Sequence, residues 1–138
     1  MVSIVDRARP GGAYLFHAAV LAGMLTLFLA TLLADVAYWR SYEIQWGNFA
    51  SWLLVGAMVL ASIAVVCEIF ALVRGGRGVI HIVLLVATWV VGFLDALHHA
   101  RDAWAIMPTA LLLSVIAVVL ALASSWIGFA GLRVGGAR

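Results

Sequence analysis

The chain has 138 residues and a formal net charge of +2; 67% of its residues are hydrophobic and only 10% are charged. A soluble domain is about half apolar and about a quarter charged, so this composition excludes a globular domain surrounded by water and indicates a membrane protein. The few charges are scattered over the ends of the apolar runs, which excludes a basic nucleic-acid-binding face, and the single cysteine, Cys67, excludes an intramolecular disulfide.

The first apolar run covers residues 14–34 and follows Pro10-Gly11-Gly12. Its length matches the roughly 20 residues that cross a bilayer core, so it predicts a transmembrane helix. The run is too long for a signal-peptide core and no small-residue cleavage site follows it, so we expect it to remain in the protein. The polar segment 35–48 is predicted as a loop, and its Trp39 and Trp46 suit the aromatic belt at a membrane surface.

Three further apolar runs of spanning length follow, over residues 49–73, 79–97 and 109–132. The segment 74–78, Arg-Gly-Gly-Arg-Gly, predicts a tight turn, so the second and third runs form an antiparallel hairpin. The segment 98–108 is predicted as a second polar loop, and Pro108 suits the start of the last helix.

Each run must be helical, because a backbone in lipid has to satisfy its own hydrogen bonds. We therefore expect residues 1–138 to form a single all-α transmembrane domain, a four-helix bundle with up-down-up-down topology. Arginines are enriched on the cytoplasmic side of membrane proteins, and only Arg40 and Arg101 fall on the opposite side here, so both termini are predicted to be cytoplasmic. The six arginines on the predicted cytoplasmic side are Arg7, Arg9, Arg74, Arg77, Arg133 and Arg138.

Two histidines, His17 and His81, lie a few residues into helices that rise from the same predicted side, so both imidazoles should lie at similar depth. Two histidines at one level on separate helices can hold a haem iron axially, and Gly128 arrives at this level with room for a flat macrocycle. The alternative is that each imidazole hydrogen-bonds a neighbouring group or Glu68 near the lipid headgroups.

A second group of ionisable residues is expected on the periplasmic side and comprises Asp35, Asp95, His98, His99, Arg101 and Asp102. Positions 95, 98, 99 and 102 share one face of a helix, where they could bind a divalent metal, relay protons, or meet a partner or a quinone. The alternative is a solvated helix end in which Asp95 pairs with His99 or Arg101. Trp46 and Trp104 would extend this group as a partner-docking surface.

Several stretches distributed over almost the whole chain resemble a known family: Phe16-His17-Ala18, Asp35-Val36-Ala37-Tyr38, Ile44-Gln45-Trp46-Gly47-Asn48-Phe49-Ala50-Ser51-Trp52-Leu53, His99-Ala100-Arg101-Asp102-Ala103-Trp104, Pro108-Thr109, Leu113-Ser114 and Trp126-Ile127-Gly128. The chain resembles the small four-helix bacterial membrane proteins catalogued as domain of unknown function twenty-two thirty-one. The resemblance implies a multi-pass protein of the bacterial inner membrane with a periplasmic oxidoreductase as partner. It assigns no catalytic residues.

We accordingly expect an accessory or electron-transfer subunit of a redox complex, one that passes electrons between a periplasmic dehydrogenase and the quinone pool. In that reading His17 and His81 bind haem b, while Trp46, His99, Arg101, Asp102 and Trp104 dock the partner. No pattern of nucleophile, phosphate loop or metal spacing marks a catalytic subunit acting on its own. The alternatives are a cofactor-free structural or assembly subunit, and a small-molecule or ion carrier that uses Glu68 and Asp95.

Overall fold

The computed structural model describes residues 11–75 and 78–135, with side chains up to residue 130, and this part of the chain contains helices and no strand. The helices are α1 (Gly12–Ser41), α2 (Ile44–Val73), α3 (Val79–His99), the short α4 (Ala103–Ile106) and α5 (Thr109–Gly135). The four long helices are each long and apolar enough to cross a membrane. The expectation of an all-α, multi-pass membrane protein is confirmed at that level.

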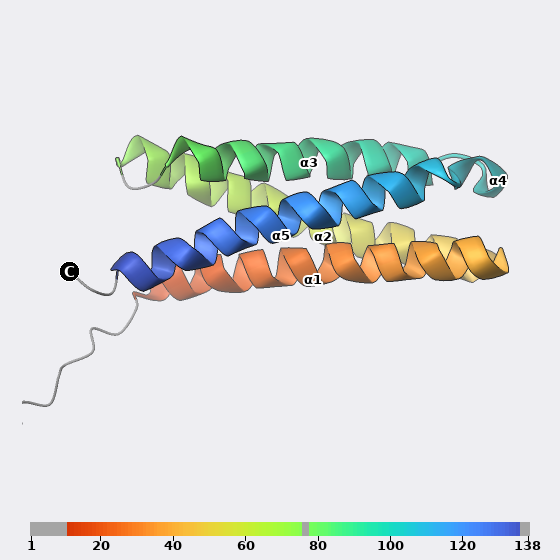
Figure 1. Ribbon diagram of the computed structural model, residues 1–138, viewed down its shortest axis with the longest axis horizontal. Helices are drawn as coiled ribbons and strands as arrows, with labels where there is room; N and C mark the ends of the chain where they lie inside the picture. The colour runs from red at the N-terminus through yellow and green to blue at the C-terminus, as the bar shows by residue number, and fades with distance from the viewer. Residues whose placement is uncertain (1–10, 76–77, 136–138) are drawn as a thin grey trace, which may run out of the picture.

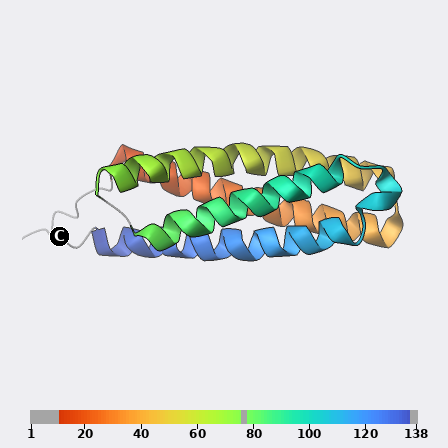
Figure 2. The same ribbon diagram turned by 90° about the horizontal axis from the view of Figure 1, so that it is seen from above.

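The four long helices lie side by side along one axis (Figure 1). Helix α1 packs against α2 and α5, and α3 packs against the same two helices. Each long helix thus has two neighbours, and the four helices form a closed bundle. The start of α1, the end of α5 and the α2–α3 turn lie at one end, here named the terminal end (Figures 1 and 2). Helix α4 and the junction between α1 and α2 lie at the opposite end, here named the α4 end.

Each long helix buries a stripe of residues spaced alternately by three and four positions, the heptad spacing of coiled-coil-like bundles. The stripe of α1 is His17, Leu21, Met24, Phe28, Thr31, Asp35 and Tyr38, and that of α2 is Gly47, Ala50, Leu54, Ala57, Ala61, Ala64 and Glu68. The stripe of α3 is His81, Leu85, Thr88, Gly92, Asp95 and His99, and that of α5 is Ala110, Ser114, Ala117, Ala121, Ser124 and Gly128. Large side chains on α1 thus face small ones on α2 and α5, which lets the helices approach closely.

The buried interior changes character along the bundle. Its middle is apolar and includes Met24, Phe28, Leu54 and Leu85, all nearly inaccessible to solvent. The ionisable members of the stripes gather near the two ends. His17 and Asp35 lie 18 positions apart on α1, which is about 27 Å along a helix and close to the thickness of a bilayer core.

The buried stripes of α1 and α3 have the same spacing. Each of the six positions in the α3 stripe lies 64 positions after a position of the α1 stripe, from His17 and His81 to Asp35 and His99. Corresponding residues meet at both ends of the bundle: the rings of His17 and His81 lie with centroids 6.0 Å apart, and His99 contacts Asp35.

The predicted loop over residues 35–48 is wrong in extent. Helix α1 continues to Ser41 and α2 begins at Ile44, because Asp35 and Tyr38 continue the buried stripe instead of facing water. Tyr42 closes α1 in a left-handed conformation (φ 53°), and its N–H donates to the Tyr38 carbonyl oxygen at 2.7 Å. The polar residues of this segment occupy helix ends, not a long loop.

The other predicted boundaries agree more closely with the structure. Helix α2 ends at Val73 and α3 begins at Val79, as the turn over 74–78 predicted, while α3 and α5 each run two or three residues beyond their predicted ends. Much of the arginine pattern lies outside the described residues: Arg7, Arg9, Arg77 and Arg138, and also the side chain of Arg133. The orientation in the membrane is therefore taken up below as a proposal.

Candidate functional site

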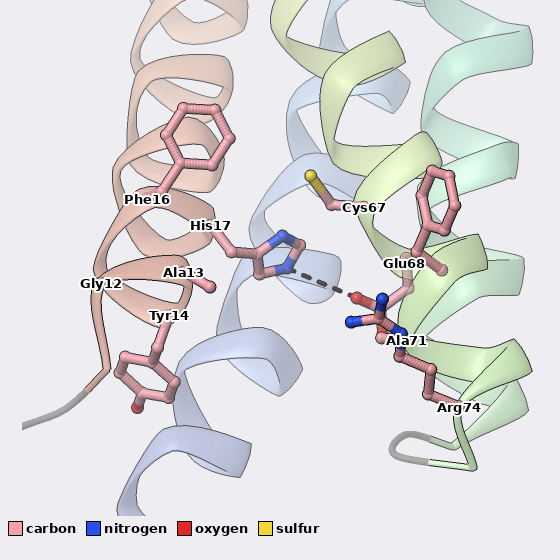
Figure 3. A pocket seen from close by; sticks show the side chains of 10 residues that line it. Gly12, Ala13, Tyr14, Phe16, His17, Cys67, Glu68, Ala71 and Arg74 are labelled. Carbon is pink, nitrogen blue, oxygen red and sulfur yellow. Dashed lines mark ion pairs between the residues drawn. The ribbon is translucent and has the colours of Figure 1, made fainter.

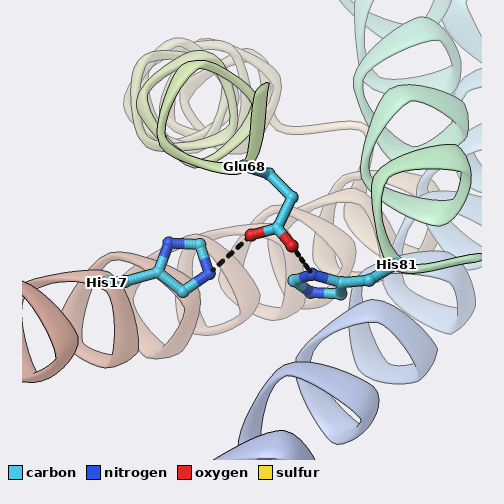
Figure 4. A group of neighbouring side chains, drawn as sticks. All are labelled: His17, Glu68 and His81. Atoms are coloured by element: carbon cyan, nitrogen blue, oxygen red, sulfur yellow. Dashed lines mark ion pairs between the residues drawn. The ribbon is translucent and has the colours of Figure 1, made fainter. Parts of the chain in front are cut away.

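At the terminal end, His17, Glu68 and His81 form a buried group, here named the terminal cluster (Figure 4). They come from α1, α2 and α3, one residue from each helix. Glu68 Oε1 lies 2.8 Å from His81 Nδ1, and Glu68 Oε2 lies 3.5 Å from His17 Nε2. The carboxylate thus lies between the two imidazoles, because all three residues occupy the outermost stripe positions at this end.

The donor atoms of the terminal cluster lie close enough together to hold one metal ion. One donor atom from each residue lies within 4.8 Å of the others. The two imidazoles contact different oxygens of the same carboxylate, His81 at Oε1 (2.8 Å) and His17 at Oε2 (3.5 Å), so all three side chains point to one small region. Two imidazoles and one carboxylate are a ligand set of zinc and of non-haem iron.

His81 is poorly satisfied by hydrogen bonds. Within the part of the chain that the structure describes, neither of its ring nitrogens makes one, although the ring is almost fully buried and Nδ1 is close to Glu68. Its Nε2 faces Gly128 of α5, where an added Cβ would lie 3.1 Å from this nitrogen and 2.5 Å from Leu21 Cδ1. The space that glycine leaves at this level is therefore filled by His81 and Leu21, not by a gap of macrocycle size.

A groove leads to the terminal cluster from the surface between α1 and α2 (Figure 3). Its volume is about 620 Å³, and its walls include Tyr14, Phe16, Phe70 and Arg74 in addition to His17 and Glu68. The walls are mainly apolar, while Arg74 is exposed at the end of α2. The cluster can therefore be reached from outside the bundle without unpacking the core.

At the α4 end, Asp35, Asp95, His99 and Ser114 form a second buried group, here named the polar ring. His99 Nε2 lies 2.8 Å from Asp35 Oδ1, and His99 Nδ1 lies 3.0 Å from the main-chain oxygen of Asp95. The hydroxyl of Ser114 is hydrogen-bonded to Oδ2 of Asp35 and lies 3.0 Å from Oδ2 of Asp95. These contacts run from α1 through α5 and α3 back to α1 and close a circle.

The structure brings together only some of the predicted periplasmic group. Asp35, Asp95 and His99 meet in the polar ring, and the predicted alternative pairing of Asp95 with His99 is present at 3.2 Å. Helix α3 ends at His99, so Asp102 is not on the predicted stripe and is exposed. Arg101 and Trp46 are also exposed, as is Trp104, which stacks on Tyr42 with 6.2 Å between ring centroids.

Ser114 has no place among the site residues predicted from the sequence, and the central position of Glu68 was only an alternative. The heptad spacing could have identified both, because Ser114 and Glu68 lie on the stripes of α5 and α2. A serine and a glutamate at stripe positions must face the side chains of neighbouring helices.

Comparisons of the chain with models of protein families, with curated proteins and with solved structures find no match.

Proposed function

We propose that this chain is a multi-pass membrane protein that binds one divalent transition-metal ion at the terminal cluster. The observation that carries the proposal is the convergence of His17, Glu68 and His81 from three helices in the buried interior. Ionisable residues are costly inside a membrane bundle, so a buried group with ligand geometry is a functional candidate. The sparse hydrogen bonding of His81 supports a ligand role, because metal coordination would satisfy its Nδ1.

In this proposal His17 Nε2, His81 Nδ1 and the carboxylate of Glu68 coordinate the ion. Three protein ligands leave a coordination position open, as in catalytic zinc sites and non-haem iron sites. The groove between α1 and α2 gives water or a small ligand access to that position. The negative charge of the Glu68 carboxylate partly compensates the charge of a bound divalent ion, which reduces the cost of burying that ion in the bundle.

The topology belongs to the same proposal. The arrangement of the helices, with both described chain ends at the terminal end (Figure 1), supports up-down-up-down crossings. The arginine distribution supports cytoplasmic termini in a bacterial inner membrane, and Arg74 at the end of α2 agrees with it. The terminal cluster would then lie in the cytoplasmic leaflet and the polar ring in the periplasmic leaflet.

The test is the metal content of the full-length chain, purified in mild detergent and titrated with zinc, manganese and ferrous iron. We expect one ion per chain at saturation, and loss of binding in His17→Ala, His81→Ala and Glu68→Gln. His98→Ala is the matched control, because His98 is a half-buried histidine outside both polar groups. Equal metal binding by the unaltered chain and by a variant that carries all three substitutions would exclude the terminal cluster as the metal site.

A redox role is the second candidate, since a ligand set that suits iron also suits electron transfer. The exposed Trp46, Arg101, Asp102 and Trp104 remain candidates for docking a periplasmic dehydrogenase, whereas His99 is buried. In this candidate haem b between His17 and His81 is the alternative redox group. The position of Glu68 between the two imidazoles favours a bare ion.

The same purification separates these candidates. A bound haem gives a Soret band that disappears in His17→Ala and in His81→Ala, whereas a bare ion gives metal without that band. A redox subunit is expected to co-purify with a dehydrogenase and to change oxidation state on addition of quinol. A stable complex without metal or chromophore would support the structural-subunit alternative instead.

A further inference from the structure

The contacts within the polar ring require a definite number of protons, and the hydrogen-bonding capacity of each atom allows those protons to be counted. His99 Nδ1 lies 3.0 Å from a main-chain carbonyl oxygen, which can only accept, so Nδ1 must carry a proton. The contact of His99 Nε2 with Asp35 Oδ1 at 2.8 Å joins two atoms that both accept when unprotonated, so it requires one more proton.

Ser114 requires a further proton. Its oxygen contacts Oδ2 of Asp35 and Oδ2 of Asp95, and a hydroxyl has only one proton to donate. If both contacts are hydrogen bonds, one of the two carboxyl groups must donate to the serine oxygen. A ring in which both aspartates are ionised leaves one of these two contacts without a proton.

The hydrogen bonds also indicate which aspartate is protonated. Asp35 accepts from His99 at Oδ1 and contacts Ser114 at Oδ2, so both of its oxygens have a partner that stabilises a carboxylate. Asp95 Oδ1 has no hydrogen bond within the described residues, where His99 Nδ1 lies 3.2 Å away. The neighbouring carboxylate of Asp35 disfavours a second negative charge on Asp95. His99 Nδ1 already donates to the main chain, so Asp95 is the less stabilised as an anion.

We propose that the polar ring binds a proton on Asp95 Oδ2, which donates to Ser114, while Asp35 is ionised and His99 is an imidazolium. The ring is then neutral overall, as a fully buried group in a membrane bundle requires. Every proton lies in a hydrogen bond, and the Ser114 hydroxyl donates its hydrogen bond to Asp35 Oδ2. The ligand of this site is a proton, in contrast to the metal ion proposed for the terminal cluster.

The surroundings supply few other charges. On α1 the next stripe residue is Tyr38, whose hydroxyl donates to the Ala103 carbonyl oxygen at 2.7 Å. Helix α2 presents Gly47 and Ala50 on its buried face near this end, and the nearest stripe neighbour of Ser114 towards the start of α5 is Ala110. Of the other titratable groups described near the end of α3, His98 is half-buried, and Arg101 and Asp102 are exposed.

The middle of the bundle separates this site from the terminal cluster. Met24, Phe28, Leu54 and Leu85 fill the space between the two polar groups, and Thr31 and Thr88 hydrogen-bond to carbonyl oxygens of their own helices. These residues provide no chain of proton carriers along the bundle. We therefore expect any exchange of the ring's proton to take place at the nearer, α4 end.

The test is infrared spectroscopy of the full-length chain in detergent at neutral pH, with aspartate labelled by carbon-13 at its carboxyl carbon. We expect one labelled C=O stretching band of a protonated carboxylic acid, shifted by deuterium exchange. The band should disappear in Asp95→Asn and remain in Asp102→Asn, the matched exposed control. Its absence from the unaltered chain at neutral pH would overturn the proposal.

Ser114→Ala is the second variant and keeps every carboxyl group. The band should move to higher frequency, because the protonated carboxyl loses its hydrogen-bond acceptor, and an unmoved band would place the proton outside the ring.

The labelled band is also recorded with zinc and with manganese. Stoichiometric binding of either ion that removes the band and depends on Asp35 would identify the ring as a metal site and contradict the proposal. Glu68→Gln should leave the labelled band unchanged, which keeps this test independent of the terminal cluster.

Discussion

The terminal cluster and the polar ring use the same kinds of side chain but satisfy them differently. In the polar ring, His99 and both aspartates join a closed set of hydrogen bonds through Ser114. In the terminal cluster, His81 makes close contact with Glu68 without a hydrogen bond in the described part of the chain. Histidine and carboxylate alone therefore do not define a site. We therefore propose protons for one group and a coordinated ion for the other.

The largest expected effect is at the polar ring and concerns Asp35. Asp35→Ala removes the partner of both His99 and Ser114, and breaking a buried ion pair on one side costs about 3–5 kcal/mol of unfolding free energy. Asp95→Asn should cost less than about 1 kcal/mol, because an amide keeps a donor for Ser114. Denaturant titration in mixed micelles measures both.

Asp102→Ala serves as the control, since substitution of an exposed side chain changes stability by less than about 0.5 kcal/mol. Equal losses for the Asp35 and Asp95 variants would contradict the assignment of the charge to Asp35.

The next effect tests whether the two polar groups are independent. A Cβ added at Gly92 would lie 2.7 Å from Met58 Sδ and 2.9 Å from Phe28 Cζ, so Gly92→Ala should cost about 1–3 kcal/mol through overpacking. Metal binding and the carboxyl band should both be unchanged, because the strain is confined to the apolar middle. A change in either would show that the middle couples the two ends.

A smaller effect is expected beside the terminal cluster. Gly128→Ala places a methyl group 3.1 Å from His81 Nε2, which shifts the imidazole and should weaken metal binding about tenfold, or about 1.4 kcal/mol. Isothermal titration with zinc measures the change. Gly78→Ala is the control, because nothing lies within 4 Å of a Cβ added at Gly78, one turn before His81. Unchanged affinity in Gly128→Ala would argue against His81 as a ligand.

The smallest effect concerns the packing of α4. Tyr38→Phe removes the hydrogen bond from the tyrosine hydroxyl to the Ala103 carbonyl oxygen, with an expected cost of about 1 kcal/mol. Amide hydrogen exchange should accelerate in α4 and remain unchanged at the middle of α3. Metal binding should not respond, since Tyr38 lies at the opposite end from the terminal cluster. An accelerated exchange throughout the bundle would show that this bond supports more than α4.

The sequence predicted four long apolar helices, because the energetic cost of placing peptide groups and apolar side chains in the wrong solvent is large. It also indicated His17, His81, Asp35, Asp95 and His99 as unusual residues in apolar surroundings. The predicted loop over 35–48 is wrong because polar residues at a helix end can be buried as well as exposed. The buried spacing that continues through Asp35 and Tyr38 shows that these residues face the core.

The partners within each group were harder to predict. Serine is common as a packing residue in membrane helices, so nothing in the composition distinguishes Ser114 from Ser62, which instead accepts a hydrogen bond from Trp89. The orientation of Glu68 between two imidazoles depends on how three helices are rotated about their axes, and that rotation is set by the packing of all the stripes together.

The common spacing of the buried stripes on α1 and α3 has a consequence for the make-up of the two polar groups. Position 17 corresponds to position 81 and position 35 to position 99, so each pair lies at one level of the bundle. The spacing brings like side chains together at the terminal end, His17 and His81, and unlike side chains at the α4 end, Asp35 and His99. A histidine therefore meets another histidine in the terminal cluster and a carboxylate in the polar ring, although the spacing of the two stripes is the same at both levels.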